Sequence, residues 1–522
     1  MKHLAVGPII ALLTLSVAGY AAAQAPPLPP EEQPAGAEVL TRGPVHEAFA
    51  EPVSLQAEAG LVAPTQPPPN IEEVPPADRP EGDNYVWVPG YWSWDADRSD
   101  YIWVSACWRV APPNMYWVPG YWSRVTDGWE WVPGFWARVG SQEIEYLPAP
   151  PDPVDVSPQG PPPAPDNVWV PGCWYWYQGR YVERRGYWLR QQPGWVWEPS
   201  HSRWTPRGYV FAEGHWDYAL EDRGVLFAPV YFPRATYARA GFSYSPTIAL
   251  DIAVLVTNLF AYPSYGHYYF GDYYDDAYVR VGIYPRFDSE RIHTWYDPIY
   301  AYDRWQHGRA DPSWEEHQRQ DFDRRRGDKA LRPPQTYREM ENRMARTPDP
   351  RQRNVAPAGP FRSVVERQAT PLRLEKIGAD ARQKIARNGN DVRRFGDERV
   401  KWEAPPAAPS AGRPGGGRDD RTASPGERQQ PMAPPHEVKK NPAVTERAAP
   451  AHSPREVKVT QPERVKIPAP PIVGRQAPAS GAVKRTLPPQ PTEERKQQAG
   501  QQKGKQKGQQ QEKEKQNKGH GD

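Results

Sequence analysis

The hexapeptide Trp87-Val88-Pro89-Gly90-Tyr91-Trp92 recurs in register within the first half of a chain of 522 residues. Its clearest variants begin at Trp103, Trp117, Trp131 and Trp169. Copies that match the motif less closely but keep a similar spacing follow further along the chain, and we count nine units in all. A fixed period indicates one supersecondary unit that is used many times. The sequence therefore predicts a repeat architecture.

Each unit is predicted to be a β-strand. Trp, Tyr, Val and Phe dominate the units, and short segments rich in Asp, Asn, Gly and Pro separate them. Short connections between successive strands favour an antiparallel arrangement. We therefore expect an all-β fold, an antiparallel meander of Trp-rich repeat strands, with a short helical segment and a long disordered C-terminal tail.

The Pro89-Gly90 pair inside the motif has two interpretations. A reverse turn would halve each strand, but the second unit has Ser105-Ala106 at the same place, and Ala tolerates a positive φ badly. A bulge explains more, because Trp87 and Trp92 would otherwise face opposite sides of a regular strand. One extra residue at the Pro-Gly pair would bring both rings to one face. We expect a bulge inside a continuous strand.

The motif tryptophans are expected to form the core of the repeats, because their spacing follows the repeat period. The predicted core rings are Trp87, Trp92, Trp103, Trp108, Trp117, Trp122, Trp131, Trp136, Trp169 and Trp174. Aromatic rings also stack on the apolar faces of sugars. For that role we expect a planar platform of tryptophans just outside the hexapeptide, edged by arginines. Its candidate rings are Trp94, Trp129 and Trp176.

The chain has two cysteines, Cys107 and Cys173, and both occupy the fifth position of the motif. Equivalent positions point to the same side of their strands, so a disulfide between the two strand groups is one hypothesis for an oxidising compartment. The alternative is two buried thiols that replace the Tyr or Phe of other units. Spacing alone does not decide between them, because it does not show how close the Cα atoms are.

The N-terminus is typical of a secretory signal. Lys2 and His3 precede an apolar run over residues 4–17, and small residues follow at Ala21-Ala22-Ala23. We expect cleavage before Gln24 and an exported chain that resides in the periplasm or outside the cell. The apolar run is short for a spanning helix, so we expect no transmembrane span in the mature chain.

Composition divides the chain further. The 66 prolines and a hydrophobic content of 38% indicate much chain without a core. We expect a signal peptide at 1–23, a proline-rich disordered spacer at 24–83, a first repeat group at 84–146, a proline-rich linker at 147–166, a second repeat group with a Tyr-rich β segment at 167–306, a charged helical segment at 307–346 and a disordered tail at 347–522. The alternation of apolar residues over 247–262 predicts a further strand.

The sequence offers little chemistry. Zincin, phosphate-loop, nucleophile-elbow and paired-Cys metal signatures are missing from it. Asp95, Asp97 and Asp100 supply oxygen ligands for calcium, but their loop lacks the central Gly and terminal Glu of a known calcium loop. We therefore expect no catalytic residue, no cofactor and no metal. A net charge of +2 argues against specific nucleic-acid binding.

Four hexapeptides meet the looser pattern W-x-x-G-x-W, and they begin at Trp87, Trp117, Trp131 and Trp169. With these residues the chain resembles exported bacterial proteins with the tryptophan-glycine-tryptophan repeat, written YXWGXW or WXXGXW. Ala106 replaces the glycine in the second unit, and Pro at the third position departs from the stricter form. The resemblance covers roughly residues 84 to 216. It implies a secreted or cell-envelope protein without an assigned activity.

We therefore expect a non-enzymatic structural or interaction protein of the bacterial cell envelope. Its partner would be an envelope polysaccharide or another envelope protein, and its oligomeric state is left open. The alternative is a carbohydrate-binding module for an envelope polysaccharide. Rings that face solvent in a row would favour the alternative, and rings that form the core would favour the first hypothesis.

Overall fold

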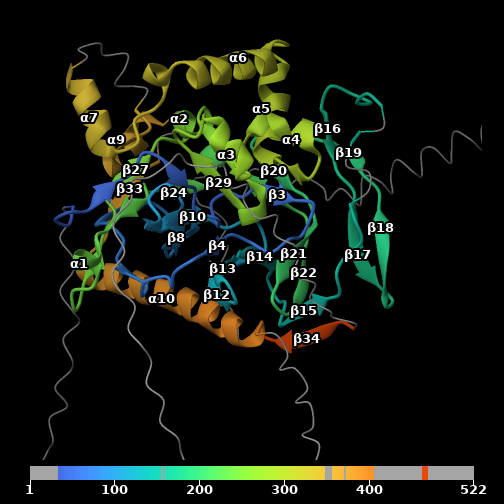
Figure 1. The fold of residues 1–522 in the computed structure, drawn as a ribbon, viewed down its shortest axis with the longest axis horizontal. Coiled ribbons are helices and arrows are strands. Elements are labelled where there is room, and N and C mark those ends of the chain that lie inside the picture. Colours follow the sequence, from blue (N-terminus) through green and yellow to red (C-terminus); the bar gives the residue numbers. More distant parts are fainter. Residues whose placement is uncertain are drawn as a thin grey trace, which may run out of the picture.

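The computed structural model describes residues 33–153, 157–158, 160–346, 356–368, 372–404 and 461–467. The predicted signal peptide and most of the predicted tail lie outside these residues. Figure 1 shows the strands between helices α6 (Trp314–Gly327) at the top and α10 (Ala379–Trp402) at the bottom. The antiparallel strands of the repeats are confirmed, whereas the all-β class is too narrow because of these helices.

Eight of the nine units form four antiparallel hairpins, each built from two successive units. Every hairpin strand is interrupted once, at the Pro-Gly position of the motif. Hairpin 1 comprises β7 (Tyr85–Val88), β8 (Tyr91–Asp95), β9 (Asp100–Val104) and β10 (Cys107–Val110); hairpin 2 comprises β11 (Met115–Val118), β12 (Tyr121–Val125), β13 (Gly128–Val132) and β14 (Phe135–Arg138). Hairpin 3 comprises β16 (Asn167–Val170), β17 (Cys173–Tyr177), β18 (Arg180–Arg184) and β19 (Tyr187–Arg190); hairpin 4 comprises β20 (Trp195–Glu198), β21 (His201–Thr205), β22 (Gly208–Ala212) and β23 (His215–Tyr218).

The interruption at Pro89-Gly90 is neither a reverse turn nor a bulge. Val88 and Tyr91 on one strand pair with Cys107 and Val104 on the other, so two residues are left out on each strand. A bulge would place an extra residue on one strand only. The predicted bulge is therefore wrong, although the predicted absence of chain reversal is confirmed. The two rings of the first unit consequently enter different hydrophobic clusters.

The ninth unit pairs out of sequence order. Its strands β24 (Gly224–Leu226) and β25 (Val230–Tyr231) pair with β10 and β9 of hairpin 1. Between the two ladders, the hydroxyl of Ser105 donates to the carbonyl of Ala228 at 2.8 Å. Hairpin 1 thus gains a strand that is remote in sequence, and a meander does not fully describe the repeats.

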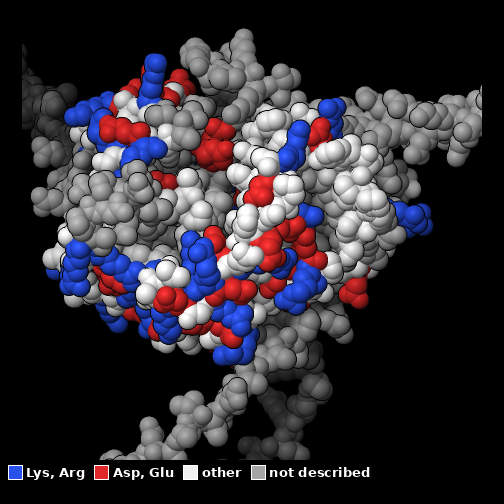
Figure 2. Space-filling model, turned by 90° about the horizontal axis from the view of Figure 1, so that it is seen from above, with Lys and Arg blue, Asp and Glu red and all other residues white. Residues whose placement is uncertain are grey.

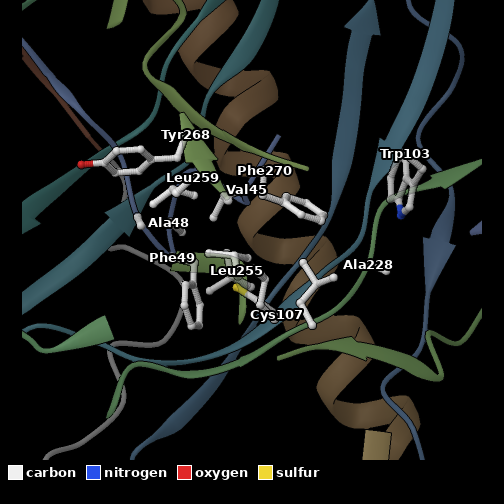
Figure 3. Close-up of a cluster of buried hydrophobic side chains, with 14 of the residues drawn as sticks. Val45, Ala48, Phe49, Trp103, Cys107, Ala228, Leu255, Leu259, Tyr268 and Phe270 are labelled. Carbon is white, nitrogen blue, oxygen red and sulfur yellow. The ribbon is translucent and has the colours of Figure 1, made fainter. Parts of the chain in front are cut away.

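Residues 33–83 are part of the core and not the predicted spacer. They form β1 (Glu38–Val39), β2 (Gly43–Pro44), β3 (Val53–Ser54), β4 (Val62–Ala63), β5 (Glu72–Glu73) and β6 (Asp78–Pro80). The stretch 39–50 is buried throughout. In Figure 3, Val45, Ala48 and Phe49 pack among residues of the hairpins and of the Tyr-rich segment. The spacer was predicted from the proline content of this segment. The apolar residues between the prolines are nevertheless buried in the core.

The tail prediction is also wrong for the part of residues 347–522 that the structure describes. This part contains β32 (Ala358–Pro360), α9 (Phe361–Arg367), β33 (Leu374–Lys376), α10 and β34 (Glu463–Lys466). Helix α10 has 24 residues without a proline, and it lies along hairpins 1 and 2 in Figure 1. Strand β34 pairs with β15 (Glu143–Leu147). The disordered tail was predicted from the average composition of residues 347–522, and this average does not reveal a single helical segment.

The Tyr-rich segment and the helical segment surround the upper side of the hairpins in Figure 1. The strand expected over 247–262 is instead β27 (Ile248–Leu250), α2 (Ile252–Val256) and β28 (Leu259–Tyr262). Asp251 causes the difference, because its carboxylate accepts a hydrogen bond from Val254 N at 3.3 Å and caps α2. Helices α6 and α7 (Tyr337–Arg346) lie in the region where a charged helical segment was expected.

The remaining elements are short. They are η1 (Leu220–Asp222), α1 (Arg234–Tyr237), β26 (Ser243–Tyr244), η2 (Pro263–Tyr265), β29 (His267–Phe270), α3 (Asp276–Arg280), β30 (Tyr284–Pro285), η3 (Arg286–Asp288), α4 (Ser289–Ile292), β31 (Trp295–Tyr296), α5 (Pro298–Gly308) and η4 (Lys329–Leu331). Within the described ranges, none of the helices has the length and apolar character that a membrane span requires.

Candidate functional site

The first tryptophan of one unit lies opposite the last tryptophan of the next. Trp87 pairs with Trp108 and Trp92 with Trp103, and their ring centroids are 5.0 and 5.2 Å apart. The pairs recur with centroids 5.2 to 5.4 Å apart at Trp117 with Trp136, Trp122 with Trp131, Trp169 with Trp188, and Trp197 with Trp216. Tilted rings at this distance stabilise a structure beyond their buried area. Each tryptophan of the motif is therefore paired with a tryptophan of the neighbouring unit across the hairpin.

The motif glycine makes room for a tryptophan of the facing unit. A Cβ atom on Gly134 would lie 2.3 Å from Cζ2 of Trp117, and one on Gly120 would lie 2.5 Å from Cζ2 of Trp131. Neither glycine has a positive φ. Close approach, and not backbone conformation, therefore requires glycine at this position.

Glu73 closes the interruption of hairpin 1. Its side chain is fully buried, and its carboxylate accepts hydrogen bonds from Gly90 N at 3.1 Å and from Ala106 N at 2.9 Å. These two N–H groups belong to the two facing interruptions and have no partner in the ladder. A buried N–H without an acceptor costs free energy, so Glu73 stabilises the break that the motif creates.

Glu47 has the same role in hairpin 2. Its two carboxylate oxygens accept from Gly120 N and Gly134 N, each at 3.1 Å. The carboxylate also accepts from Nε1 of Trp131 at 3.3 Å. Both carboxylates come from the N-terminal segment 33–83, so this segment joins the repeats through their backbone.

Helix α10 binds the carbonyl groups of the same interruptions. Arg399 donates to Pro119 O at 2.7 Å and to Pro133 O at 3.2 Å. Arg393 donates to Gly90 O at 3.4 Å, and its guanidinium lies 3.8 Å from Glu73. The interruptions of hairpins 1 and 2 are thus held by carboxylates that accept from N–H groups and by guanidinium groups that donate to carbonyls. We call this arrangement of Glu47, Glu73, Arg393 and Arg399 the clamp.

The charge state of the clamp depends on burial. Burial raises the pKa of Glu73 to about 7, although Arg393 and two backbone N–H groups lower it in part. Burial likewise raises the pKa of Glu47 to about 6. Both carboxyl groups therefore exchange protons near neutral pH.

His46 lies beside the clamp as a neutral ring. Its Nε2 lies 3.1 Å from Pro89 O, and its Nδ1 accepts from Ala48 N at 3.1 Å. Burial lowers the pKa of the imidazole to about 4. A single tautomer, with the proton on Nε2, satisfies both neighbours.

A cavity of about 310 Å³ lies where hairpins 1 and 2 meet α10. Its walls are the interruptions at Pro89-Gly90 and Pro119-Gly120, α10 residues between 392 and 400, and the loop 66–70. Aromatic and charged groups line it together, among them Tyr91, Trp117, Trp122, Glu47, Arg393 and Asp397. The motif, the clamp and accessible polar side chains meet in this cavity.

A comparison with known protein families identifies the same repeats. A family model described as the WXXGXW repeat, in two copies, matches residues 82–109, 113–137 and 193–217. The chain therefore contains WXXGXW repeats. The three matched stretches coincide with hairpins 1, 2 and 4, so two copies of the WXXGXW motif make one hairpin. Searches of curated proteins and of solved structures found no match.

The predicted WXXGXW core rings fall into two groups. Six are buried: Trp87, Trp92, Trp103, Trp108, Trp131 and Trp136. Four are half-buried: Trp117, Trp122, Trp169 and Trp174. The prediction of core rings agrees with hairpin 1 throughout, whereas hairpins 2 and 3 leave part of their rings accessible.

The predicted sugar-stacking platform does not form. Trp94, Trp129 and Trp176 lie in three different hairpins. Trp94 packs on the large central cluster, Trp176 packs on a separate cluster, and Trp129 pairs with Ala63 of the N-terminal segment. These rings flank the WXXGXW motif in the sequence, but each hairpin directs its own ring to a different neighbour.

The predicted disulfide does not form either, since Cys107 and Cys173 are free thiols. Cys107 is fully buried in β10, opposite Val88. Cys173 is half-buried in β17, opposite Arg184. Burial raises the pKa of both thiols. The alternative hypothesis of two buried thiols therefore agrees with Cys107, which is fully buried. It agrees only in part with Cys173, which is half-buried.

The acidic loop of hairpin 1 uses its carboxylates within the protein. Asp95 accepts from Asp97 N at 3.0 Å, and Asp97 pairs with Arg42 at 2.5 Å. Asp100 accepts from Tyr101 N at 2.7 Å. In the part of the chain that the structure describes, no group of three or more His, Cys, Asp or Glu side chains is placed to hold a metal ion.

Sequence reasoning missed all four residues of the clamp. Glu47 and Glu73 lie in the segment that was predicted to be a spacer, and Arg393 and Arg399 lie in the predicted tail. One signal was available, because α10 places Gly389, Arg393 and Gly396 on one face at helical spacing. Gly389 packs on Trp87 and Pro89, at 3.4 and 3.6 Å from where its Cβ would lie.

Proposed function

We propose that this WXXGXW repeat protein is a non-enzymatic structural or interaction protein of the bacterial cell envelope, and that it is exported. The repeat match and the signal-like N-terminus support the proposal. Its partner would be an envelope polysaccharide or another envelope protein.

The clamp is the observation that carries the proposal. Buried carboxylates are often catalytic when they converge on a cleft. Here Glu47 and Glu73 each accept from two backbone N–H groups, and Arg393 and Arg399 donate to backbone carbonyls. The buried carboxylates and guanidinium groups of the clamp therefore form hydrogen bonds with the backbone of the repeats. Such bonds are expected in a structural framework.

The location is tested by expressing the full chain in a bacterial host and measuring the mass of the purified protein. Export predicts a chain that begins at Gln24 and is recovered from the periplasm or the medium. An intact mass that retains Lys2, together with recovery from the cytoplasm, would contradict the proposal.

The interaction role is tested with the same exported chain. Chemical cross-linking in envelope fractions should yield a reproducible adduct with wild-type protein. The clamp variant Glu47→Gln with Glu73→Gln should lose this adduct together with its thermal transition, because the interaction depends on the framework. The control Glu72→Gln lies next to Glu73 but is only half-buried, and it should keep both. An adduct that survives loss of the thermal transition would contradict a framework role.

The carbohydrate-binding alternative loses its original basis, because Trp94, Trp129 and Trp176 do not share a surface. A sugar site in this protein has to lie elsewhere in the molecule.

A further inference from the structure

Two tryptophans of one repeat unit remain partly accessible to solvent. Trp117 and Trp122 are the first and last rings of the third unit, and both are half-buried. The equivalent rings of the first unit, Trp87 and Trp92, are only 6% and 1% exposed. Both accessible rings line the cavity of about 310 Å³ between hairpins 1 and 2. The cavity is therefore lined by the two partly accessible rings of the third unit and by the buried ring of Trp92.

The cavity opens to solvent between α10 and the loop 66–70. The exposed lining residues Asp397 and Val400 stand on the helix side, and the exposed residues Gln66 and Asn70 stand on the loop side. These four side chains form the mouth. The other walls include Pro89-Gly90, Pro119-Gly120 and the two indole rings.

One buried donor of the cavity lining is unused within the described residues. Nε of Arg393 is inaccessible to solvent and has no hydrogen-bond partner, although another nitrogen of the same guanidinium donates to Gly90 O. A buried N–H of this kind costs free energy, and an acceptor in the cavity reaches it only after a small shift of the guanidinium. The side chain also carries a full charge one helical turn from the carboxylate of Asp397, so donors and acceptors stand side by side.

We propose that this cavity binds a neutral sugar ring, as a monosaccharide or as the end of a disaccharide. The indoles of Trp117 and Trp122 supply faces for the C–H side of the ring. Hydroxyl groups both donate and accept, which matches Arg393, Asp397 and the amides of Gln66 and Asn70. The volume lies at the lower end of the range of about 300–1,000 Å³ for small-ligand pockets, so one or two rings fit and a polymer groove does not.

Other ligand classes suit the lining less well. An anion would meet the carboxylates of Glu47 and Asp397, and Arg393 is already shared with Glu73 at 3.8 Å. A purely apolar ligand would remove Arg393 and Asp397 from water without giving them partners, which costs free energy. The inference concerns the cavity alone and does not depend on where the protein resides.

The test is ligand-observed saturation-transfer NMR with the full chain, followed by titration calorimetry. The probes are methyl β-glucopyranoside, N-acetylglucosamine, cellobiose and diacetylchitobiose, with glucuronic acid as the charged comparison. We expect saturation of the ring C–H protons of at least one neutral probe, because these protons would lie on the indoles. We expect weaker binding of glucuronic acid.

Three variants connect the binding to the cavity without disturbing the framework. Val400→Trp fills the mouth and should abolish binding. Asp397→Asn removes a charged acceptor and should weaken binding about tenfold. The control Glu398→Gln lies next to Asp397 on α10, pairs with Lys401 at 2.6 Å and should leave binding unchanged. All three variants should keep the wild-type melting temperature, because positions 397 and 400 are exposed and the ion pair of position 398 is at the surface.

Four outcomes would overturn the proposal. They are no binding of any neutral probe, wild-type binding by Val400→Trp, tighter binding of glucuronic acid than of the glucoside, and binding only of a synthetic proline-rich peptide with the sequence of residues 467–473. The last outcome would assign the cavity to a peptide. None of these outcomes bears on export or on the clamp, so the proposed framework function is judged separately.

Discussion

Hairpins 1 and 3 carry the same motif but differ in what surrounds them. Trp92 and Trp103 of hairpin 1 are 1% and 0% exposed, whereas Trp169 and Trp174 of hairpin 3 are half-buried. Hairpin 1 is covered by the N-terminal segment, by the ninth unit and by α10. Hairpin 3 packs on hairpin 4 through a small cluster. The motif therefore builds the hairpin, and the flanking segments decide whether its rings become core.

The interruptions of the two hairpins differ in the same way. In hairpin 1, Glu73 accepts from both facing N–H groups. Among the described residues, no carboxylate is placed against Gly172 or Gly186 of hairpin 3. Hairpin 3 lies on the right flank of Figure 1, and this flank carries few charged side chains on the face seen in Figure 2. Hairpin 3 thus has less support from the rest of the chain than hairpin 1.

The largest expected effect is the loss of a ring in hairpin 1. Trp103→Ala should lower the free energy of unfolding by about 3–5 kcal/mol, because it leaves a large cavity in the core. Trp169→Ala, the first tryptophan of hairpin 3, should cost about 1–2 kcal/mol, because part of the ring already lies in solvent. Urea unfolding followed by circular dichroism measures both values. Equal costs would break the comparison between the hairpins.

A smaller effect is expected at the motif glycine. Gly134→Ala would place its Cβ 2.3 Å from Trp117 and 2.6 Å from Val118 O, and overpacking of this kind costs about 1–3 kcal/mol. Gly308→Ala is the control, since its Cβ would meet nothing within 4 Å. The control should be neutral or stabilising by about 0.5 kcal/mol. Differential scanning calorimetry of both variants checks the prediction, and an unchanged Tm for Gly134→Ala would contradict the role of the glycine.

The clamp adds a pH dependence to hairpin 1. Glu73→Gln leaves one backbone N–H without a good acceptor and should cost about 1–3 kcal/mol at about pH 5. The pKa of Glu73 is raised from 4.5 to about 7 in the folded protein, mainly by burial. The stability linked to its proton is therefore present below 4.5 and is lost as the pH rises through about 7.

Since the wild type loses this stability and Glu73→Gln does not titrate, the cost of the substitution should shrink between about pH 5 and pH 8. Urea titrations across this interval measure the change, and Glu72→Gln serves as the matched control with a flat difference. A cost that grows toward pH 8 would show that charged Glu73 stabilises the clamp more than burial penalises it.

The smallest effect on stability is expected at Cys173, and Cys107 serves as its buried counterpart. Cys173→Ser should change the free energy of unfolding by about 0.5 kcal/mol or less, because the side chain is half-buried. Cys107→Ser should cost about 1–3 kcal/mol, because it buries a hydroxyl in the core. Alkylation of the native protein should label Cys173 before Cys107, whose pKa is raised by burial. Protection of both thiols until a reductant is added would instead indicate a disulfide.

Sequence reasoning was most successful where the structure is local. The repeat count, the antiparallel pairing of neighbouring units and the buried rings of hairpin 1 follow from spacing, because strands joined by short turns pair with each other. It failed where a segment packs on residues that are remote in the sequence. Residues 39–50 and α10 have compositions that average to disorder over long windows, although their apolar residues belong to the core.

The candidate site shows the same division. Trp117 and Trp122 were identified from the motif, but their accessible faces follow from the cavity beneath α10. The platform of Trp94, Trp129 and Trp176 was wrong, because these rings lie on separate hairpins whose strands do not form one sheet. The disulfide failed for the same reason, since the same motif position in hairpins 1 and 3 does not bring the thiols together.

The sequence by itself determined the hairpin: the period of tryptophan, the small residue that a facing indole needs, and the turns that pair each unit with the next. These features act between residues that are neighbours in the chain or across one turn. Only the tertiary structure decided which rings are buried, which N–H groups Glu47 and Glu73 accept from, and where the cavity lies. Those outcomes depend on contacts between segments up to hundreds of residues apart. The entropy of closing a loop changes only slowly with its length, so such contacts do not require a fixed spacing in the sequence.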